Sequence, residues 1–569
     1  MLQELQFTSL MRRLPENMRV GAKVTELNDS AAKLPSIEVR EDLPNSLDNP
    51  VVVAFEDGQI ILSDNPARAY RTTLTKAAKL LSGHRVVAHD LKSLARLFLD
   101  RNLPANFLAE YDTKHASFLL NSLKPILNLR DYAISLGAAN PELVDLLSTT
   151  YVLWRRTSEE LAGESKLEQL AKTVDFPLQL VLAKMEHRGV AVDASILSSM
   201  STKLANEIGL LEQAIWQTVG YEFNVSSPKQ LSDALFVKLQ LPPTAKKNKS
   251  GNYPTGAKEL AKLAGQHPVI NMISEYRELT KLKSTYVDAL PRAVAPDGRI
   301  HTTLDQDVTA TGRLSSSNPN LQNIPTRSDR GKEIKRAFIA PTGRVIINAD
   351  YAQFELRLAA ALAGDRNMIE MFENPGNDIH TMTAAEAYGI APDQVTPEQR
   401  RHAKVINFGV LYGMSPHGLA EATGMDLSSA SAFIRRYFAI RKPIRDFIDN
   451  TLELAEKRGY VETLFGRRRP TPDVKSANFM VREAAKRAAA NMPIQGTEAD
   501  LMKMAMLKIE QIDGASQIMQ VHDSIMVECN QADAERIASE MKQVMEQIYP
   551  QLGVRLLVDI KIGRSWAEV

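Results

Sequence analysis

Short apolar runs alternate with longer amphipathic stretches over about residues 21–165. Apolar runs bounded by turn-forming residues are typical of strands, whereas apolar residues spaced about every three or four positions are typical of helices. This alternation predicts an α/β domain. The expected strands are residues 51–55, 59–62 and 85–88, and the expected helices are residues 67–81 and 91–100.

From residue 166 to about 300 the pattern is mostly helical, with an interruption by LPPTAKKNKSGNYPTG over residues 241–256. Pro, Gly and Asn in this segment indicate a loop. Beyond about residue 301, short strands mix with long helices, which suggests a second α/β body with a helical insertion. A chain of 569 residues has room for several such domains.

The composition is that of an ordinary soluble globular chain, since hydrophobic residues make up 44% and charged residues 24%. No apolar run approaches the roughly 18 residues of a membrane span, so no membrane partner is expected. The start, MLQELQFTSLMRRL, lacks the apolar core and cleavage site of a secretory signal. Cys529 is the single cysteine, which excludes disulfides and Cys-based zinc sites within the chain.

The net charge is only +1, yet the basic residues are clustered. Local basic patches, rather than the total charge, form grooves that bind phosphate. Any one patch taken alone could equally be a solvated surface. The clusters are Lys246, Lys247 and Lys249, residues 327–336, then Arg400, Arg401 and Lys404, and finally Arg467, Arg468 and Arg469.

Two segments each place an acid beside a strand. In VIINADYAQFELRLAAALAG, residues 345–347 are typical of a buried strand, Asp350 comes at its end, and a helix is expected from Tyr351. In SQIMQVHDSIMVEC, two β-rich runs flank His522, Asp523 and Ser524, which indicates a tight hairpin with an acid at its tip. An ordinary turn Asp would give the same local pattern.

Paired acids of this kind suit phosphoryl transfer to a 3′-hydroxyl. Two Mg²⁺ ions about 4 Å apart can activate the hydroxyl and stabilise charge on the phosphorus. Mg²⁺ prefers carboxylates, carbonyls, waters and phosphate oxygens. Two Asp side chains could therefore bridge both ions, while a triphosphate substrate supplies further ligands.

A helix with a basic and an aromatic end is expected over residues 397–413. Arg400, Lys404, Phe408 and Tyr412 recur every four residues, a step that drifts by only about 40° around a helix. All four therefore lie on one side, where the cations could hold a triphosphate and the rings a base and sugar. A surface helix above a core-facing aromatic pair is the alternative.

Four motifs in order carry a resemblance to DNA polymerase family A, and within it to bacterial DNA polymerase I. It is strong over residues 166–569 and weaker over the first 165. The motifs are TATGRLSSSNPNLQNIP from Thr309, DYAQFELR from Asp350, RRHAKVINFGVLYG from Arg400 and QVHDS from Gln520.

The resemblance implies an α/β multi-domain chain. An exonuclease-like, RNase H-like α/β domain precedes a right-hand polymerase domain with palm, fingers and thumb. MLQELQFTSL resembles the segment that joins a 5′ nuclease domain in longer members, so residues 1–20 are expected to be a linker remnant without that nuclease. The expected bounds are 21–165 for the exonuclease-like domain and 166–569 for the polymerase, with the thumb at about 190–300, the palm at about 301–365 and 490–569, and the fingers at about 366–489.

By the same resemblance the chain is a DNA-dependent DNA polymerase that adds dNMPs to a primer 3′-hydroxyl and releases pyrophosphate. Asp350, Asp523 and the Tyr351 carbonyl would bind two Mg²⁺ ions, which Mn²⁺ could replace. Lys404 would donate a proton to pyrophosphate. The implied partners are primer–template DNA and dNTPs, with the protein acting as a monomer. The implied location is cytoplasmic, in a bacterial nucleoid or phage-infected cell, with an organellar origin left open.

Further residues match the family's substrate contacts. Arg400, Lys404 and His380 would hold the triphosphate, Phe408 would contact the sugar, Tyr412 would face the template base, Glu355 would exclude ribonucleotides at the sugar 2′ position, and Gln353 would also contact the nucleotide. Arg313 and Gln495 would contact minor-groove acceptors, which every correct base pair presents. Arg487, Asn491 and His522 would line the same duplex, while Arg277, Lys281 and the loop around Lys246 would be thumb contacts.

One departure concerns the hairpin, because family DNA polymerases usually have Glu after its Asp, whereas this chain has Ser524. Single-subunit RNA polymerases of the phage type, distant relatives, also have His-Asp-Ser. RNA synthesis is therefore an alternative, although Glu355 and Phe408 fit the deoxynucleotide pattern. A catalytically silent DNA-binding module is another, against which the intact Asp350 and Asp523 argue.

A second departure concerns proofreading, which in the family needs acids from separate motifs to hold metal ions. In the first motif Glu56 and Asp57 do not form the expected Asp-x-Glu pattern. In the second motif Ser93 stands where an Asp is expected, and in the third Thr149 and Thr150 occupy the region of the Asp. A hydroxyl does not replace a carboxylate at a Mg²⁺ site with comparable affinity. The exonuclease-like domain is therefore predicted to be inactive.

Overall fold

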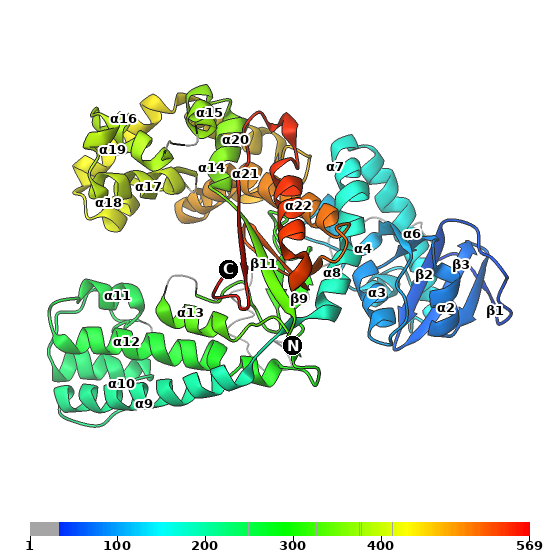
Figure 1. Cartoon of the computed structure of the whole chain (residues 1–569), viewed down its shortest axis with the longest axis horizontal. Coiled ribbons are helices and arrows are strands. Elements are labelled where there is room, and N and C mark those ends of the chain that lie inside the picture. Colours follow the sequence, from blue (N-terminus) through cyan, green and yellow to red (C-terminus); the bar gives the residue numbers. More distant parts are fainter. Residues whose placement is uncertain (1–33, 249, 326–327, 375, 377, 412) are drawn as a thin grey trace. The chain divides into compact units, whose positions relative to one another are not determined.

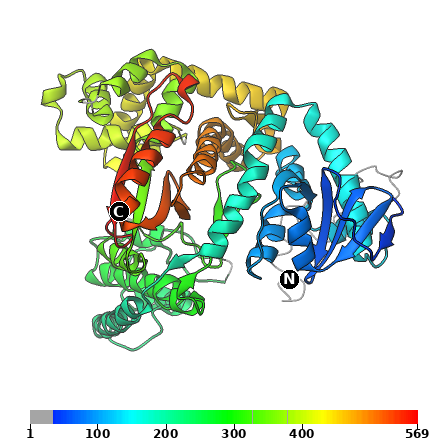
Figure 2. The same cartoon turned by 45° about the vertical axis from the view of Figure 1, so that its right-hand side comes forward.

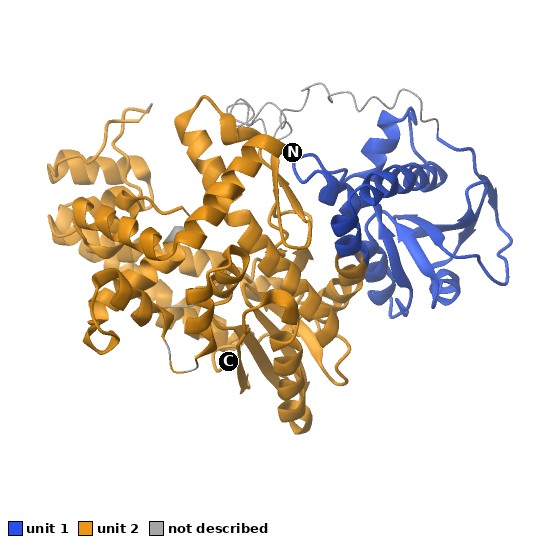
Figure 3. Cartoon of the chain, turned by 90° about the horizontal axis from the view of Figure 1, so that it is seen from above, with its two compact units in different colours: residues 1–172 blue, residues 173–569 orange. Residues whose placement is uncertain are grey.

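The computed structural model describes residues 34–248, 250–325, 328–374, 376, 378–411 and 413–569. The chain divides into two compact units, one ending at Lys172 and the other covering Thr173–Val569 (Figure 3). The predicted linker remnant, residues 1–20, lies outside the described residues, as do Tyr412 and Lys249. No helix within the described ranges is both long and apolar enough to cross a membrane.

The first unit is built on a six-stranded mixed sheet of order β1-β4-β3-β2-β5-β6. The buried apolar residues of β2 lie between antiparallel β3 and parallel β5, and α6 packs on β2 and β3 (Figure 1). The strands are β1 Glu38–Arg40, β2 Val51–Glu56, β3 Gln59–Asn65, β4 Arg68–Thr72, β5 Arg85–Ala88 and β6 Leu108–Asp112. The helices are α2 Leu74–Leu81, α3 Leu91–Leu99, α4 Thr113–Leu120, α5 Leu129–Ser135, α6 Leu143–Ala162 and α7 Ser165–Leu170.

The three strands predicted in this unit are confirmed, but the single helix predicted over residues 67–81 is wrong in its first part. Arg68–Thr72 forms β4, in which Ala69 and Tyr70 are buried against the neighbouring strands. The helix begins only after Thr73, whose hydroxyl accepts a hydrogen bond from the Lys76 N–H as an N-cap. The cap therefore separates a strand from a helix within one amphipathic stretch.

The second unit contains a four-stranded antiparallel sheet of order β14-β15-β11-β16. Alternate residues of β11 enter two different cores, with Val345 and Ile347 in one and Ile346 in the other. The helix α22 (Ala534–Glu546) packs on β11, β15 and β16 (Figure 2). The strands are β11 Arg344–Tyr351, β14 Ser516–Val521, β15 Ser524–Asn530 and β16 Val558–Gly563.

Helices carry the rest of this unit. Among them α9 and α12 run side by side around an apolar core of their own (Figure 1). The helices before the sheet are α8 Phe176–Arg188, α9 Ala194–Val219, α10 Pro228–Ser232, α11 Ala257–Lys262, α12 Pro268–Leu282 and α13 Asp329–Arg336, with short strands β7 Val190–Ala191, β8 Arg299–Ile300, β9 Thr303–Asp305 and β10 Ser315–Ser317. After β11 come α14 Phe354–Ala363, α15 Arg366–Glu373, α16 Ile379–Tyr388, α17 Pro397–Leu411, α18 Pro416–Thr423, α19 Leu427–Ile440, α20 Lys442–Arg458, β12 Tyr460–Glu462, β13 Arg468–Pro470 and α21 Phe479–Ile509.

Candidate active site

The sheet register brings the two acids of the motifs to one end of the sheet. In the β11–β15 ladder Asp350 lies opposite Ser524, and Asp523 directly precedes β15. The Tyr351 N–H donates a 3.1 Å hydrogen bond to the Asp523 carbonyl, which ties the hairpin tip to the end of β11. His522 has a φ of 51°, as a tight hairpin turn favours. The hairpin predicted from the sequence is confirmed.

The strand around Asp350 is longer than predicted. Asp350 comes at the end of β11, as predicted, but the strand continues through Tyr351 and α14 begins at Phe354 instead of Tyr351. Gln353, with a φ of 54°, makes the turn between strand and helix. The strand extends because β16 pairs with β11 through Tyr351.

Negative charge accumulates around Asp350. Asp350 is exposed to solvent. Partial burial of its carboxyl and the charges of Asp523 and Asp559 nevertheless raise its pKa to about 6, although the charges of Lys561 and Lys335 act to lower it. Asp559 lies opposite Asp350 in β16, so the two side chains leave the same face of the sheet. Sequence reasoning missed Asp559, which has no motif around it.

The donors at this end of the sheet fit a divalent cation. Carboxylate oxygens of Asp350 and Asp523 are hard ligands, and a cation beside them would relieve the repulsion that raises the pKa of Asp350. Across the described ranges, no group of three or more His, Cys, Asp or Glu residues could hold a metal ion on its own. Water, backbone oxygen or substrate phosphate would therefore have to complete the ligand set.

A cavity of about 300 Å³ opens beside these acids. Its walls come from the β14–β15 hairpin, the start of α14, and the helices α16 and α17. Most of the predicted nucleotide residues thus face one space together with Asp523. The lining residues are Gln353, Phe354, Glu355, His380, Arg400, Lys404, Phe408 and Asp523.

His380 is held as a neutral hydrogen-bond donor in this cavity. Burial, together with the positive charges of Arg400 and Lys404, lowers its pKa to about 4 despite the opposing charge of Asp378. The Asn407 amide nitrogen lies 3.1 Å from Nδ1 and can only donate to it. The proton of the neutral ring is then on Nε2. Asn407 is a residue that sequence reasoning missed, although it lies on α17 one turn after Lys404.

Arg400 is paired with an acid in this structure. Its Nε lies 2.6 Å and its Nη2 3.2 Å from the carboxylate of Asp378, which also caps α16 through the Thr381 N–H. Although burial opposes it, hydrogen bonds from Arg400 and Thr381 lower the pKa of Asp378 to about 2. Arg400 is thereby oriented toward the cavity by an acid that remains ionised at neutral pH.

One nitrogen of Arg313 joins two glutamates at the edge of both cavities. Its Nη2 lies 2.8 Å from Glu355 Oε1, and 2.7 and 2.8 Å from the two oxygens of Glu498. Burial and the charge of Asp523 raise the pKa of Glu498 well above its ordinary value. Sequence reasoning missed Glu498, which stands three residues after Gln495 and so on the same face of α21.

A second cavity, of about 320 Å³, lies between α21 and the segment around Arg313. It brings together Arg313, Gln495 and His522, three of the residues that the sequence predicts to contact DNA. Its polar lining also includes Gln322, Lys503 and Gln520, and the Gln322 amide donates to the Gln520 carbonyl at 3.2 Å.

The other predicted DNA contacts line neither cavity. Arg487 is exposed and Asn491 half-buried, both earlier on α21. Arg277 and Lys281 lie on α12, where the Arg277 guanidinium donates to the backbone carbonyl and, at 3.2 Å, to the hydroxyl of Thr255.

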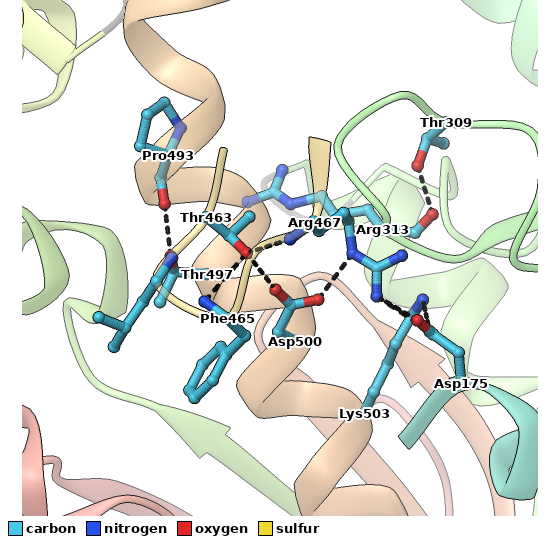
Figure 4. A network of polar contacts seen from close by, with 11 residues as sticks. Asp175, Thr309, Arg313, Thr463, Phe465, Arg467, Pro493, Thr497, Asp500 and Lys503 are labelled. Carbon is cyan, nitrogen blue, oxygen red and sulfur yellow. Dashed lines mark hydrogen bonds and ion pairs between the residues drawn. The ribbon is translucent and has the colours of Figure 1, made fainter. Parts of the chain in front are cut away.

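A buried ionic network (Figure 4) includes Lys503, which also lines the second cavity. The Arg467 guanidinium donates to Asp175 at 2.8 Å and to Asp500 at 2.7 Å, and the Lys503 ammonium lies 2.8 Å from Asp175. Gly312, with a φ of +83°, lies so close that a Cβ would come within 2.5 Å of Arg467 Nε. The network fixes α21 to the start of α8 and to the β12–β13 hairpin.

This network corrects the interpretation of Arg467, Arg468 and Arg469 as one surface patch. Arg467 is 2% exposed and neutralised by acids that lie far from it in sequence. Arg468 is half-buried over the ring of Tyr460, at 4.3 Å from its centroid. Only tertiary contacts decide that the first of these arginines belongs to the interior.

Four residues at or near the expected proofreading positions of the first unit are engaged within its own fold. The Arg130 guanidinium is paired with Glu56, with an Nε–Oε1 distance of 3.0 Å. Asp112 is fully buried and accepts backbone N–H groups that begin α3 and α4, at 2.7 and 3.0 Å. The hydroxyls of Thr149 and Thr150 donate to carbonyls one turn earlier in α6, at 2.6 and 2.9 Å.

Comparisons with known proteins agree with the motifs. The sequence profile of DNA polymerase family A matches residues 194–568. The thermostable DNA polymerase I of Thermus caldophilus is 48% identical over 418 residues, which are 73% of this chain and 50% of that protein. DNA polymerase I of Deinococcus radiodurans is 46% identical over 399 residues, 69% of this chain and 42% of that protein. The chain thus spans about half the length of these curated relatives.

A solved structure extends the likeness to the fold. The POL domain of Pol1 from M. smegmatis, in complex with DNA primer-template and dNTP, superposes with a TM-score of 0.84 and 34% sequence identity. The match covers 91% of this chain and 95% of that one. The family profile matches most of the chain, the relatives are 46–48% identical to it, and the solved structure has the same fold. This chain therefore belongs to DNA polymerase family A.

Proposed function

We propose that this chain is a DNA-dependent DNA polymerase, which adds dNMPs to a primer 3′-hydroxyl and releases pyrophosphate. The observation that carries the proposal is the convergence of Asp523 with Glu355, Arg400, Lys404 and Phe408 on one cavity. These residues come from three separate segments, and a hairpin acid, paired cations and an aromatic ring match the parts of a deoxynucleoside triphosphate. The names of the relatives support the same activity.

Asp350, Asp523 and the Tyr351 carbonyl would hold two Mg²⁺ ions, which Mn²⁺ could replace. When bound, such ions supply charge stabilisation at the phosphorus and lower the pKa of an oxygen nucleophile. The register of β11 and β15 fixes the two carboxylates at one sheet end before any ion arrives. The excess negative charge around Asp350 supports this assignment.

The chain's own residues would bind and orient the nucleotide. Arg400, Lys404 and the Nε2–H of His380 would hold the triphosphate, and Lys404 would donate a proton to the departing pyrophosphate. Phe408 would lie against the sugar, while Glu355 would occupy the space of a ribose 2′-hydroxyl. Gln353 would contact the nucleotide from the β11–α14 turn. The role of Tyr412 against the template base stays a prediction, since it lies outside the described residues.

Primer–template DNA would occupy the second cavity and the surface beyond it. Arg313, Gln495 and His522 offer hydrogen bonds to minor-groove acceptors, with Arg487 and Asn491 farther along α21. In this assignment the four-stranded sheet is the palm, α15 to α20 belong to the fingers, and α9 to α12, with Arg277 and Lys281, form the thumb. The protein would act as a monomer in the cytoplasm, in a bacterial nucleoid or a phage-infected cell.

Primer extension tests the proposal. Purified protein is given a primed template with Mg²⁺ and either dNTPs or rNTPs in separate reactions, beside a reaction with EDTA. We expect extension with dNTPs only, and none with EDTA. Extension with rNTPs at an equal rate would contradict the role of Glu355 and favour the RNA-synthesis alternative. Binding of DNA without any extension would contradict the polymerase proposal.

A primer with a mismatched 3′ end should not be shortened by this protein. In the first unit Glu56 is paired with Arg130, Asp112 caps helices, and Thr149 and Thr150 donate within α6. Within the described residues, no group of three or more His, Cys, Asp or Glu could hold a metal ion, so we expect the first unit to be a structural support. Incubation with Mg²⁺ and no nucleotide, followed by gel analysis, measures this. Progressive loss of 3′ nucleotides would overturn the expectation.

A further inference from the structure

Glu498 is a third carboxyl at the candidate active site, and no motif of the sequence assigns it a role. It extends from α21, and only 1% of its side chain is exposed. One of its neighbours is Asp523, whose charge acts on it. The other is Arg313, whose Nη2 lies 2.7 and 2.8 Å from its two oxygens. A carboxyl buried between an essential acid and a cation has little freedom to move.

The hairpin makes room for this arrangement. Family polymerases usually have Glu after the hairpin Asp, but here the position is Ser524, which is buried. The Ser524 hydroxyl donates a hydrogen bond of 3.0 Å to the Val521 carbonyl, which stabilises the hairpin turn. The carboxyl beside Asp523 therefore comes from α21 rather than from the hairpin.

Glu498 and Glu355 share a partner, Arg313. Arg313 Nη2 donates to Glu355 Oε1, at 2.8 Å, and to the two oxygens of Glu498. All three oxygens accept from the same nitrogen, so the position of the guanidinium depends on Glu498 as well as on Glu355. Without the Glu498 side chain, the Arg313 guanidinium would lose two of these three bonds and would gain rotamers.

We propose that Glu498 is a positioning residue for sugar selection: it holds Arg313, and Arg313 holds Glu355 in the place that a ribose 2′-hydroxyl would need. This inference rests on the proposed polymerase function. A gate that excludes one hydroxyl group must be rigid, since a carboxylate that can turn away leaves the space open. Glu498 supplies that rigidity from the DNA side of the site.

The test is the ratio of kcat/KM for a dNTP to kcat/KM for the matching rNTP in single-nucleotide addition. Glu498→Gln keeps the shape but replaces one of the two oxygens that accept from Arg313 with an amide nitrogen, which cannot accept. We expect the ratio to fall about tenfold or more, mainly through a lower KM for the rNTP. Any loss at Asp523 slows both nucleotides alike and cancels in the ratio. Arg313→Lys, which loses the fork geometry, should lower the ratio in the same way.

Glu528→Gln is the matched control. Glu528 is equally buried and is held by Arg299 at 2.9 Å and by Arg344 at 2.8 Å, but it lines neither cavity. The same chemical change there should lower the thermal midpoint without changing the ratio. A double variant gives a second check: in a Glu355→Ala background, Glu498→Gln should cause no further loss of selectivity.

The outcomes separate the two proposals. A wild-type protein that adds no dNTP would contradict the proposed function itself. An active wild type whose ratio is unchanged by both Glu498→Gln and Arg313→Lys would overturn the positioning role alone. So would equal losses of selectivity from Glu498→Gln with and without Glu355.

Discussion

Asp523→Ala should reduce nucleotide addition by about a thousandfold or more, and Asp350→Ala should do the same. Metal ions at a phosphoryl-transfer site are worth several kcal/mol of transition-state stabilisation, and each 1.36 kcal/mol is about tenfold in rate. The strands β11 and β15 place these two acids side by side. A site for two metal ions needs both carboxylates as ligands, so the loss of either one should be severe. Single-turnover addition of one dNTP to a primed template measures the loss.

Asp329→Ala is a suitable control, since the Asp329 side chain is 98% exposed on α13 and lines neither cavity. It should retain the wild-type rate. Circular dichroism should show that all three variants are folded. If Asp523→Ala and Asp350→Ala added nucleotides within a few-fold of the wild-type rate, the hairpin and β11 acids would not hold the metal ions.

Asp175→Ala should have the largest effect on stability, lowering the free energy of unfolding of the second unit by about 3–5 kcal/mol. Asp175 is fully buried and neutralises both Arg467 and Lys503. Lys503, whose pKa burial and the charge of Arg467 lower to about 8, could lose its proton after the substitution. Arg467 could not, so it would keep a buried charge balanced by Asp500 alone.

Thermal and urea denaturation followed by far-UV circular dichroism measure this effect. Asp449→Ala offers a matched control, because Asp449 forms an exposed pair with Arg445 at 2.8 Å and should cost less than about 1 kcal/mol. A midpoint for Asp175→Ala equal to that of Asp449→Ala would mean that the buried network contributes little to the stability of α21.

Local pattern was a good guide wherever a segment's neighbours in sequence decide its structure. The β14–β15 hairpin and the helix carrying Arg400 and Lys404 follow from apolar runs and four-residue spacing, and the structure has both. The error over residues 67–81 has the opposite cause. There a strand and a helix share one amphipathic pattern, and pairing with β3 selects the strand for the first part.

The residues that sequence reasoning missed act through contacts between distant segments. Asp559 reaches Asp350 only because β16 pairs with β11, and Glu498 reaches Asp523 only because α21 lies beside the hairpin. Arg467 looked like part of a surface patch because its partners Asp175 and Asp500 are remote in sequence. Of these three residues, only Glu498 could have been inferred from the sequence, because it lies on the same face of α21 as Gln495.

The most direct test of the central claim offers each of the four dNTPs separately opposite each template base, with Mg²⁺ and a matched primer. The proposed polymerase should add only the complementary dNTP, and the preferred nucleotide should change each time the template base is changed. Addition that ignores the template base, or no addition in any of the combinations, would contradict the claim that this site copies DNA.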